Sequence, residues 1–140
     1  MLAAALAALL LQTAPATPTP APPMVVVREA DVRVEQNPPP HNGVGNSTAF
    51  RLSDAVPGRN FEFRKRILHP GASIGLHVLT HDEIYYVVSG RGEVASDGRI
   101  ETIGPDTAAY LFEGADVGIK QAGDEPLVLI IAYPLGRRLP

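Results

Sequence analysis

The stretch Gly71-Ala72-Ser73-Ile74-Gly75-Leu76-His77-Val78-Leu79-Thr80-His81-Asp82-Glu83-Ile84-Tyr85-Tyr86-Val87-Val88-Ser89-Gly90 carries the most structural information in this chain of 140 residues. Its apolar and aromatic residues predict two strands separated by a short polar turn. Side chains alternate between the two faces of a strand, so His77 shares a face with Leu79, and Glu83 shares a face with Tyr85. A histidine and a carboxylate are thereby brought close to one turn between two strands.

Short strands and turn signals continue on both sides of this stretch. Asp97-Gly98, between two short β-prone segments, is typical of a type I′ hairpin. In residues 61–68, apolar and charged residues alternate, which predicts a half-buried strand with Phe61, Phe63 and Ile67 on one face. Further strands are expected over residues 107–112, 117–121 and 127–133. No segment after the N-terminal leader has helical periodicity, so the pattern predicts an all-β sandwich or barrel.

The spacing Gly71-x5-His77-x-Leu79-x3-Glu83-x6-Gly90 resembles the first motif of the cupin superfamily, whose usual form is Gly-x5-His-x-His-x3or4-Glu-x6-Gly. Leu79 stands where that motif has its second histidine. The resemblance covers roughly the last hundred residues at a one-domain scale. It implies a small cupin-type jelly-roll barrel, built from two facing antiparallel sheets with the ligand site inside, and a homodimer.

A second cupin motif, with a third histidine, is expected near the C-terminus. Gly114-x2-Val117-x3-Gln121 keeps its spacing, with Val117 at the place of the histidine and Asp116 as an alternative occupant of that place. The resemblance implies that Val117, Ile119 and Gln121 face the interior. Both motifs are therefore degenerate at metal-ligand positions.

Composition limits the classes of function. A chain of 140 residues fits one domain with a real core. Twelve basic and fifteen acidic residues give a formal charge of −3 without a block of either sign, which disfavours nucleic acid as a partner. The absence of cysteine excludes disulfides, thiol nucleophiles and thiolate metal sites. No P-loop, nucleophile elbow or dinucleotide fingerprint is present.

The N-terminal region divides into a leader and a proline-rich arm. Residues 1–16 are read as a signal peptide, because a short apolar run is followed by the small-x-small pattern Ala14-Pro15-Ala16. The protein is then expected to be exported, periplasmic or extracellular, without a membrane span after cleavage. A start at Met24 would instead leave a cytoplasmic protein. Residues 17–42 are predicted to be a linker and N-terminal arm, and residues 43–140 the cupin domain.

Four side chains are predicted to be the polar contacts of a small ligand: His77, Glu83, Tyr85 and Gln121. They would lie among apolar walls, which is the usual composition of a small-molecule site. His77, Glu83 and Tyr85 are also the candidate catalytic residues, because an imidazole and a buried carboxylate can exchange a proton near neutral pH. His41 and His69 are expected to be exposed in turns.

A metal site requires about three protein ligands, and neither leucine nor valine offers a lone pair. His77 and Glu83 supply two ligands, and His81 would supply a third only if residues 80–82 curl inward. We therefore expect the protein to bind either one divalent transition-metal ion (Zn, Mn, Fe or Ni) or no cofactor.

Three hypotheses of function remain open. The first is an exported cupin that binds a small polar metabolite, a sugar or a carboxylic acid, inside the barrel. The second is an enzyme, either metal-dependent through His77, His81 and Glu83 or a metal-free acid–base isomerase or lyase that uses His77 and Glu83. The third is a non-catalytic interaction module. Arg64 and Arg66 are expected at the surface, but would be able to bind an acidic substrate if their strand had the opposite orientation.

Overall fold

The computed structural model of this protein describes residues 12–136, so residues 1–11, most of the predicted signal peptide, lie outside the described residues. The described part is all-β, and its one helical element is the single 3₁₀ turn η1 (Glu29–Asp31). No helix among residues 12–136 is long and apolar enough to cross a membrane.

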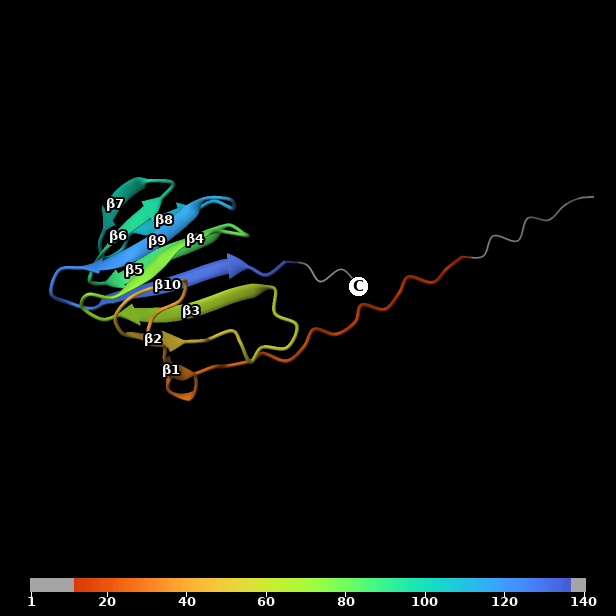
Figure 1. Ribbon diagram of the computed structural model, residues 1–140. Helices are drawn as coiled ribbons and strands as arrows, with labels where there is room; N and C mark the ends of the chain where they lie inside the picture. The colour runs from red at the N-terminus through yellow and green to blue at the C-terminus, as the bar shows by residue number, and fades with distance from the viewer. Residues whose placement is uncertain (1–11, 137–140) are drawn as a thin grey trace, which may run out of the picture.

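Ten strands form two antiparallel sheets that face each other (Figure 1). The larger sheet has the order β1-β2-β3-β10-β5-β8, and the smaller sheet has the order β4-β9-β6-β7. Their bounds are β1 (Arg33–Glu35), β2 (Ser47–Phe50), β3 (Phe61–Leu68), β4 (Ser73–Val78), β5 (Glu83–Ser89), β6 (Arg91–Ser96), β7 (Arg99–Ile103), β8 (Ala108–Leu111), β9 (Asp116–Ala122) and β10 (Leu127–Pro134). This arrangement agrees with the expected jelly roll.

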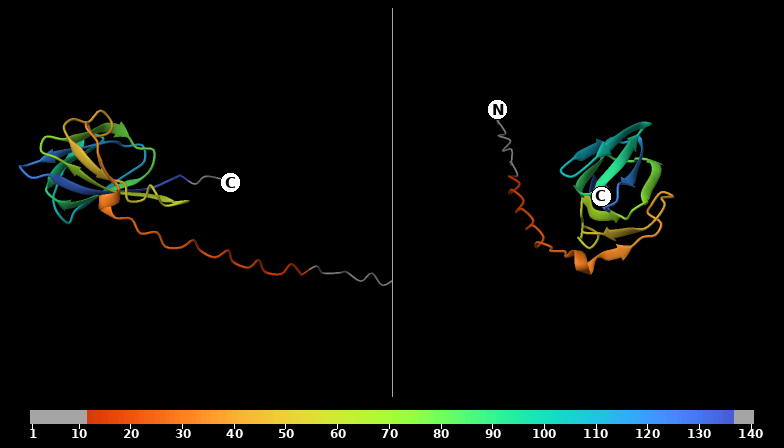
Figure 2. Two further views of the ribbon diagram at one scale, coloured as in Figure 1. Left: turned by 90° about the horizontal axis from the view of Figure 1, so that it is seen from below. Right: turned by 90° about the vertical axis from the view of Figure 1, so that its left-hand side faces the viewer.

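The N-terminal arm has two parts. Residues 12–28 have no regular secondary structure and run away from the sheets as an extended segment (Figures 1 and 2). From β1 onward the chain belongs to the larger sheet, because Arg33–Glu35 pair with Thr48–Phe50 of β2. The Asn37 side chain also accepts a hydrogen bond from the backbone N–H of Ser47 at 2.8 Å. The segment from residue 33 to residue 42, expected to be part of the arm, is therefore built into the sandwich.

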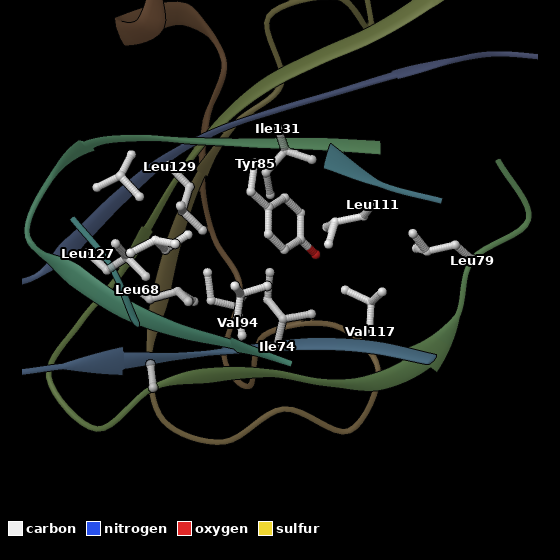
Figure 3. Close-up of a cluster of buried hydrophobic side chains, with 14 of the residues drawn as sticks. Leu68, Ile74, Leu79, Tyr85, Val94, Leu111, Val117, Leu127, Leu129 and Ile131 are labelled. Atoms are coloured by element: carbon white, nitrogen blue, oxygen red, sulfur yellow. The ribbon is translucent and has the colours of Figure 1, made fainter. Parts of the chain in front are cut away.

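The apolar core lies between the sheets (Figure 3). Most of the longer strands contribute alternate residues, as the pleat of a strand requires. From the larger sheet come Leu68, Tyr85, Val87, Leu127, Leu129 and Ile131, and from the smaller sheet come Ile74, Val94, Ile103, Val117 and Ile119. The core extends along the sandwich from Leu127 to Leu79, as Figure 3 shows.

Strand β3 turns inward the face that was predicted to point outward. Phe61 and Phe63 point outward and are 66% and 45% exposed, whereas Arg66 is only 1% exposed. Glu62, Arg64, Arg66 and Leu68 form the inward face. The prediction that Arg64 and Arg66 lie at the surface was wrong, because these inward charged residues find polar partners and a cavity inside the sandwich.

Strand β4 contains an irregularity that also changes the predicted faces. Its register against β9 shifts between Ile74 and His77. Because of this bulge, Ile74 and His77 both face inward although they are three residues apart.

Candidate ligand-binding cavity

A cavity of about 280 Å³ opens between the sheets near the β4–β5 turn. Its walls carry an unusual number of polar side chains for the inside of a small domain. The lining residues that bear a charge, an imidazole or a phenol are His41, Arg64, Arg66, His77, His81, Glu83, Tyr85 and Tyr133. Cavities of this kind, with a few converging polar groups, are the usual form of a small-molecule site.

Arg66 supplies a buried positive charge on the β3 side of the cavity. Its guanidinium donates hydrogen bonds to the Ser47 hydroxyl and to the Gln36 side-chain carbonyl, each at 2.9 Å. Its Nε is buried and has no hydrogen-bond partner within residues 12–136. Among the described residues, no carboxylate lies within ion-pair distance of Arg66. Burial lowers the pKa of Arg66 to about 10, which leaves the group charged at neutral pH.

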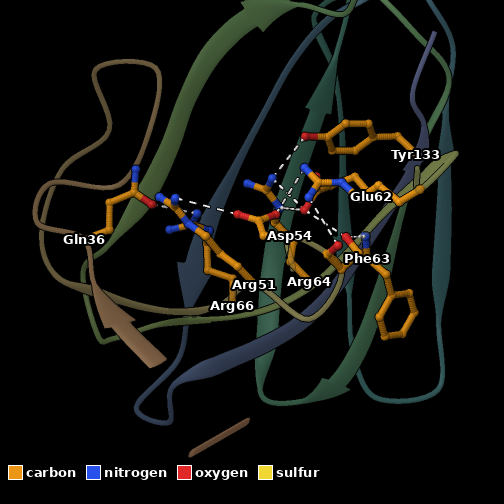
Figure 4. A network of polar contacts seen from close by, with 10 residues as sticks. Gln36, Arg51, Asp54, Glu62, Phe63, Arg64, Arg66 and Tyr133 are labelled. Atoms are coloured by element: carbon orange, nitrogen blue, oxygen red, sulfur yellow. Dashed lines mark hydrogen bonds and ion pairs between the residues drawn. The ribbon is translucent and has the colours of Figure 1, made fainter. Parts of the chain in front are cut away.

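Arg64, by contrast, is neutralised within the protein (Figure 4). Its guanidinium lies 2.9 Å from the carboxylate of Glu62, which is itself buried. Arg64 also donates to the Tyr133 hydroxyl at 3.2 Å. Arg59 is a second partner of Glu62, at 3.2 Å. The network leaves Arg66 as the buried arginine of the cavity whose charge has no carboxylate partner.

Strand β5, separated from β3 by β10 in the same sheet, supplies Glu83 and Tyr85 to the cavity. Glu83 is 6% exposed, and burial raises the pKa of its carboxyl to about 7, although the charge of Arg64 opposes that rise. Burial, reinforced by the charge of Glu83, also raises the pKa of Tyr85, so its hydroxyl remains protonated. The sequence prediction that both side chains face the interior is confirmed.

His77 lies against His41, a residue that the sequence had placed simply in an exposed turn. The two rings stack in parallel, with centroids 3.5 Å apart. The His41 backbone lies so close to β4 that a Cβ on Gly75 would sit 1.8 Å from its carbonyl oxygen. Glycine at position 75 therefore allows residues 40–42 to close the cavity wall. Burial and the charge of His77 lower the pKa of His41.

His81, in the turn before β5, stacks on Tyr133 with ring centroids 4.0 Å apart. Its Nδ1 lies 3.9 Å from a Glu83 carboxylate oxygen. The imidazole nearest to Glu83 is thus His81, whereas the Nδ1 of His77 lies 2.9 Å from the carbonyl of Gly75. The His77–Glu83 pair of the acid–base hypothesis is not the pair that this geometry brings into contact.

Gln121 does not line the cavity, contrary to prediction. Its side-chain carbonyl accepts a hydrogen bond from the backbone N–H of Gly71. Its amide nitrogen donates to the carbonyls of Ala122, Gly123 and Glu125. These bonds tie two loops together, and the amide has no free hydrogen bond for a ligand.

The described residues do not fit a transition-metal site with three protein ligands. No three histidine, aspartate or glutamate side chains among residues 12–136 converge on one position. His77, His81 and Glu83 are therefore not brought together as one ligand set. Leu79 and Val117, at the two places where the resemblance would put histidines, are buried in the apolar core. Neither side chain offers a donor atom.

Several cavity residues were not predicted from the sequence. His41 and Tyr133 were missed because each is held by a stack whose partner is distant in sequence. Arg66 was considered only under the alternative orientation of β3. The available signal was the two charges Arg64 and Arg66 at alternate positions of a strand, which place both on one face.

Comparison with known proteins identifies the class of the fold. The family model described as a cupin domain matches residues 65–133. With many cupins among the similar solved structures, this match shows that the two-sheet unit is a small cupin-superfamily domain. A search of curated protein sequences finds no match.

Three solved structures illustrate the similarity. A predicted oxalate decarboxylase from Thermotoga maritima is 25% identical, with 80% of this chain and 99% of that chain covered and a TM-score of 0.70. The polyketide cyclase RemF from Streptomyces resistomycificus is 23% identical, with 83% and 82% covered and a TM-score of 0.69. An RmlC-like cupin from Shewanella frigidimarina is 21% identical, with 66% and 78% covered and a TM-score of 0.56.

Proposed function

We propose that this cupin domain binds a small organic acid in the cavity between its sheets. The observation that carries the proposal is Arg66, a buried cation on the cavity wall without a carboxylate partner among the described residues. Moving an unpaired charge from water into a protein interior costs roughly several kcal/mol, because the charge loses its hydration. A bound carboxylate would offset that cost through charge-assisted hydrogen bonds.

Of the two ligand classes expected from the sequence, the acid is favoured over the sugar. A neutral sugar would leave the Arg66 charge uncompensated, whereas a monocarboxylate would neutralise it. Arg64 does not compete for the ligand's charge, because it is paired with Glu62. The similarity to a predicted oxalate decarboxylase supports the same ligand class, since oxalate is a small carboxylate.

A thermal-shift series tests the proposal. Butanoate is expected to raise the melting temperature, because a ligand that binds only the folded state stabilises it by mass action. Butanamide, which has nearly the same shape without the charge, and glucose are expected to have no effect at equal concentration. Sodium chloride at matched ionic strength is the control. Equal shifts for butanoate and butanamide, or a shift with glucose alone, would contradict an anion site.

We also propose that the outer face of the larger sheet forms a homodimer. Strands β3, β5 and β8 of this sheet expose large apolar side chains there, and Phe112 directly after β8 extends the face: Phe61, Phe63, Ile84, Tyr86, Val88, Tyr110 and Phe112. Contiguous exposed apolar surface of this kind is typical of protein–protein interfaces.

Sedimentation velocity tests the dimer. Phe63→Lys is expected to weaken self-association by about tenfold or more, because it places a charge in the apolar contact. Leu76→Lys, at an exposed apolar position on the other sheet, is the matched control and should leave the dimer intact. A monomeric wild-type protein, or a dimer disrupted only by Leu76→Lys, would refute this interface.

A further inference from the structure

Two side chains on the β5 wall of the cavity have unused hydrogen-bonding capacity. The Tyr85 hydroxyl and the Glu83 carboxyl make no hydrogen bond to any described residue, although both side chains are more than nine-tenths buried. The Nδ1 of His81 lies 3.9 Å from a Glu83 carboxylate oxygen, beyond hydrogen-bond distance. Buried polar groups in proteins nearly always have a partner. The cavity contents are the remaining source of one.

These two groups lie two strands away from the arginines on the inner face of the same sheet. In the larger sheet, Arg64 of β3 pairs with Ile131 of β10, which pairs in turn with Tyr85 of β5. Adjacent strands are about 4.8 Å apart, so the β3 and β5 backbones are separated by roughly 10 Å. Ile131 between them is buried and apolar. Figure 3 shows the Tyr85 ring extending from its strand toward the opposite sheet.

The cavity thus has a cationic side and a side with a phenol and a carboxyl, separated by an apolar floor. A plain carboxylic acid would satisfy Arg66 and leave Tyr85 and Glu83 without partners. A carbonyl oxygen would only accept the Tyr85 hydrogen bond. A hydroxyl group can accept from Tyr85 and donate to Glu83 at the same time.

We propose that the ligand is a hydroxycarboxylic acid whose carboxylate lies against Arg66 and whose hydroxyl group hydrogen-bonds with Tyr85 and Glu83. This inference rests on the proposed function, because it takes Arg66 as the carboxylate anchor. It adds a class of ligand, since Tyr85 and Glu83 on β5 favour acids that carry a hydroxyl group in addition to the carboxylate.

Calorimetric titrations with butanoate and its 2-, 3- and 4-hydroxy derivatives test the inference. At least one isomer is expected to bind about fivefold to tenfold more tightly than butanoate, because one or two neutral hydrogen bonds strengthen binding by about that factor. Tyr85→Phe should remove most of that advantage while changing the affinity for butanoate by less than about twofold. Tyr86→Phe, at a tyrosine exposed on the outer face, is the matched control.

The outcomes separate the two proposals. If butanoate binds but no hydroxy isomer binds better, or if the advantage persists in Tyr85→Phe, the hydroxyl site is overturned and the anion site stands. If wild-type protein binds none of the four acids, both proposals are overturned. Thermal melts of each variant establish that a change in affinity does not reflect unfolding.

Discussion

Replacement of Arg66 by methionine is expected to weaken butanoate binding about 30-fold or more and to leave the unliganded protein at least as stable as the wild type. The loss of affinity follows because removing one partner of a buried charge pair costs about 2 kcal/mol or more. The stability follows because Arg66 is a buried cation without a carboxylate partner among residues 12–136. Methionine removes that charge and fills much of the same volume.

Arg64→Met is the matched comparison, since both arginines point inward from β3. Arg64 lies 2.9 Å from the buried Glu62 carboxylate, so its loss should destabilise the fold by about 1–3 kcal/mol. Urea unfolding measures the stability of the two variants, and calorimetry measures their affinity. If Arg66→Met were the more destabilising change and butanoate still bound normally, Arg66 would be a structural residue.

Glu83→Gln is expected to gain stability relative to the wild type as the pH rises, so that the difference in free energy of unfolding favours the variant more at pH 8 than at pH 5. Burial raises the pKa of Glu83 from its ordinary 4.5 to about 7. Between these values the unfolded chain has lost its proton while the folded protein keeps it, so the folded state binds more protons and stability falls as pH rises. This contribution is fully present below pH 4.5 and is lost once the pH passes about 7.

The shift corresponds to about 3 kcal/mol of wild-type stability lost over this range, a loss that glutamine cannot undergo. Urea unfolding at several pH values between 4 and 9 gives the difference between Glu83→Gln and the wild type. Glu93→Gln, at an exposed position of β6, is the control for the removal of a carboxylate. A difference that does not change with pH would show that Glu83 ionises normally in the folded protein.

The fold class was predictable from the sequence because turn residues and alternating apolar residues are local signals. Simple alternation along a strand rich in tyrosine and valine placed Glu83, Tyr85 and Val87 on one face, and the cupin resemblance implied that this face looks inward. The cupin resemblance covered the motif around His77 and supplied the two-sheet arrangement.

The failures occurred where long-range contacts override a local pattern. β3 presents its phenylalanines outward, because Arg64 and Arg66 find inward partners in Glu62, Ser47 and Gln36. Such partners cannot be read from an eight-residue pattern. The bulge in β4 also breaks the simple alternation of faces, and glycine at position 75 leaves room for the backbone of His41. These two departures create the cationic side of the cavity and part of its wall.

The most direct test of the central claim, that a guanidinium rather than a metal ion anchors the ligand's carboxylate, is a calorimetric titration of butanoate with and without a chelator. The prediction is one site per chain with the same affinity in both conditions. Binding that disappears with the chelator and returns with a divalent metal ion would contradict the claim, and would mean that the ligand is held by a metal.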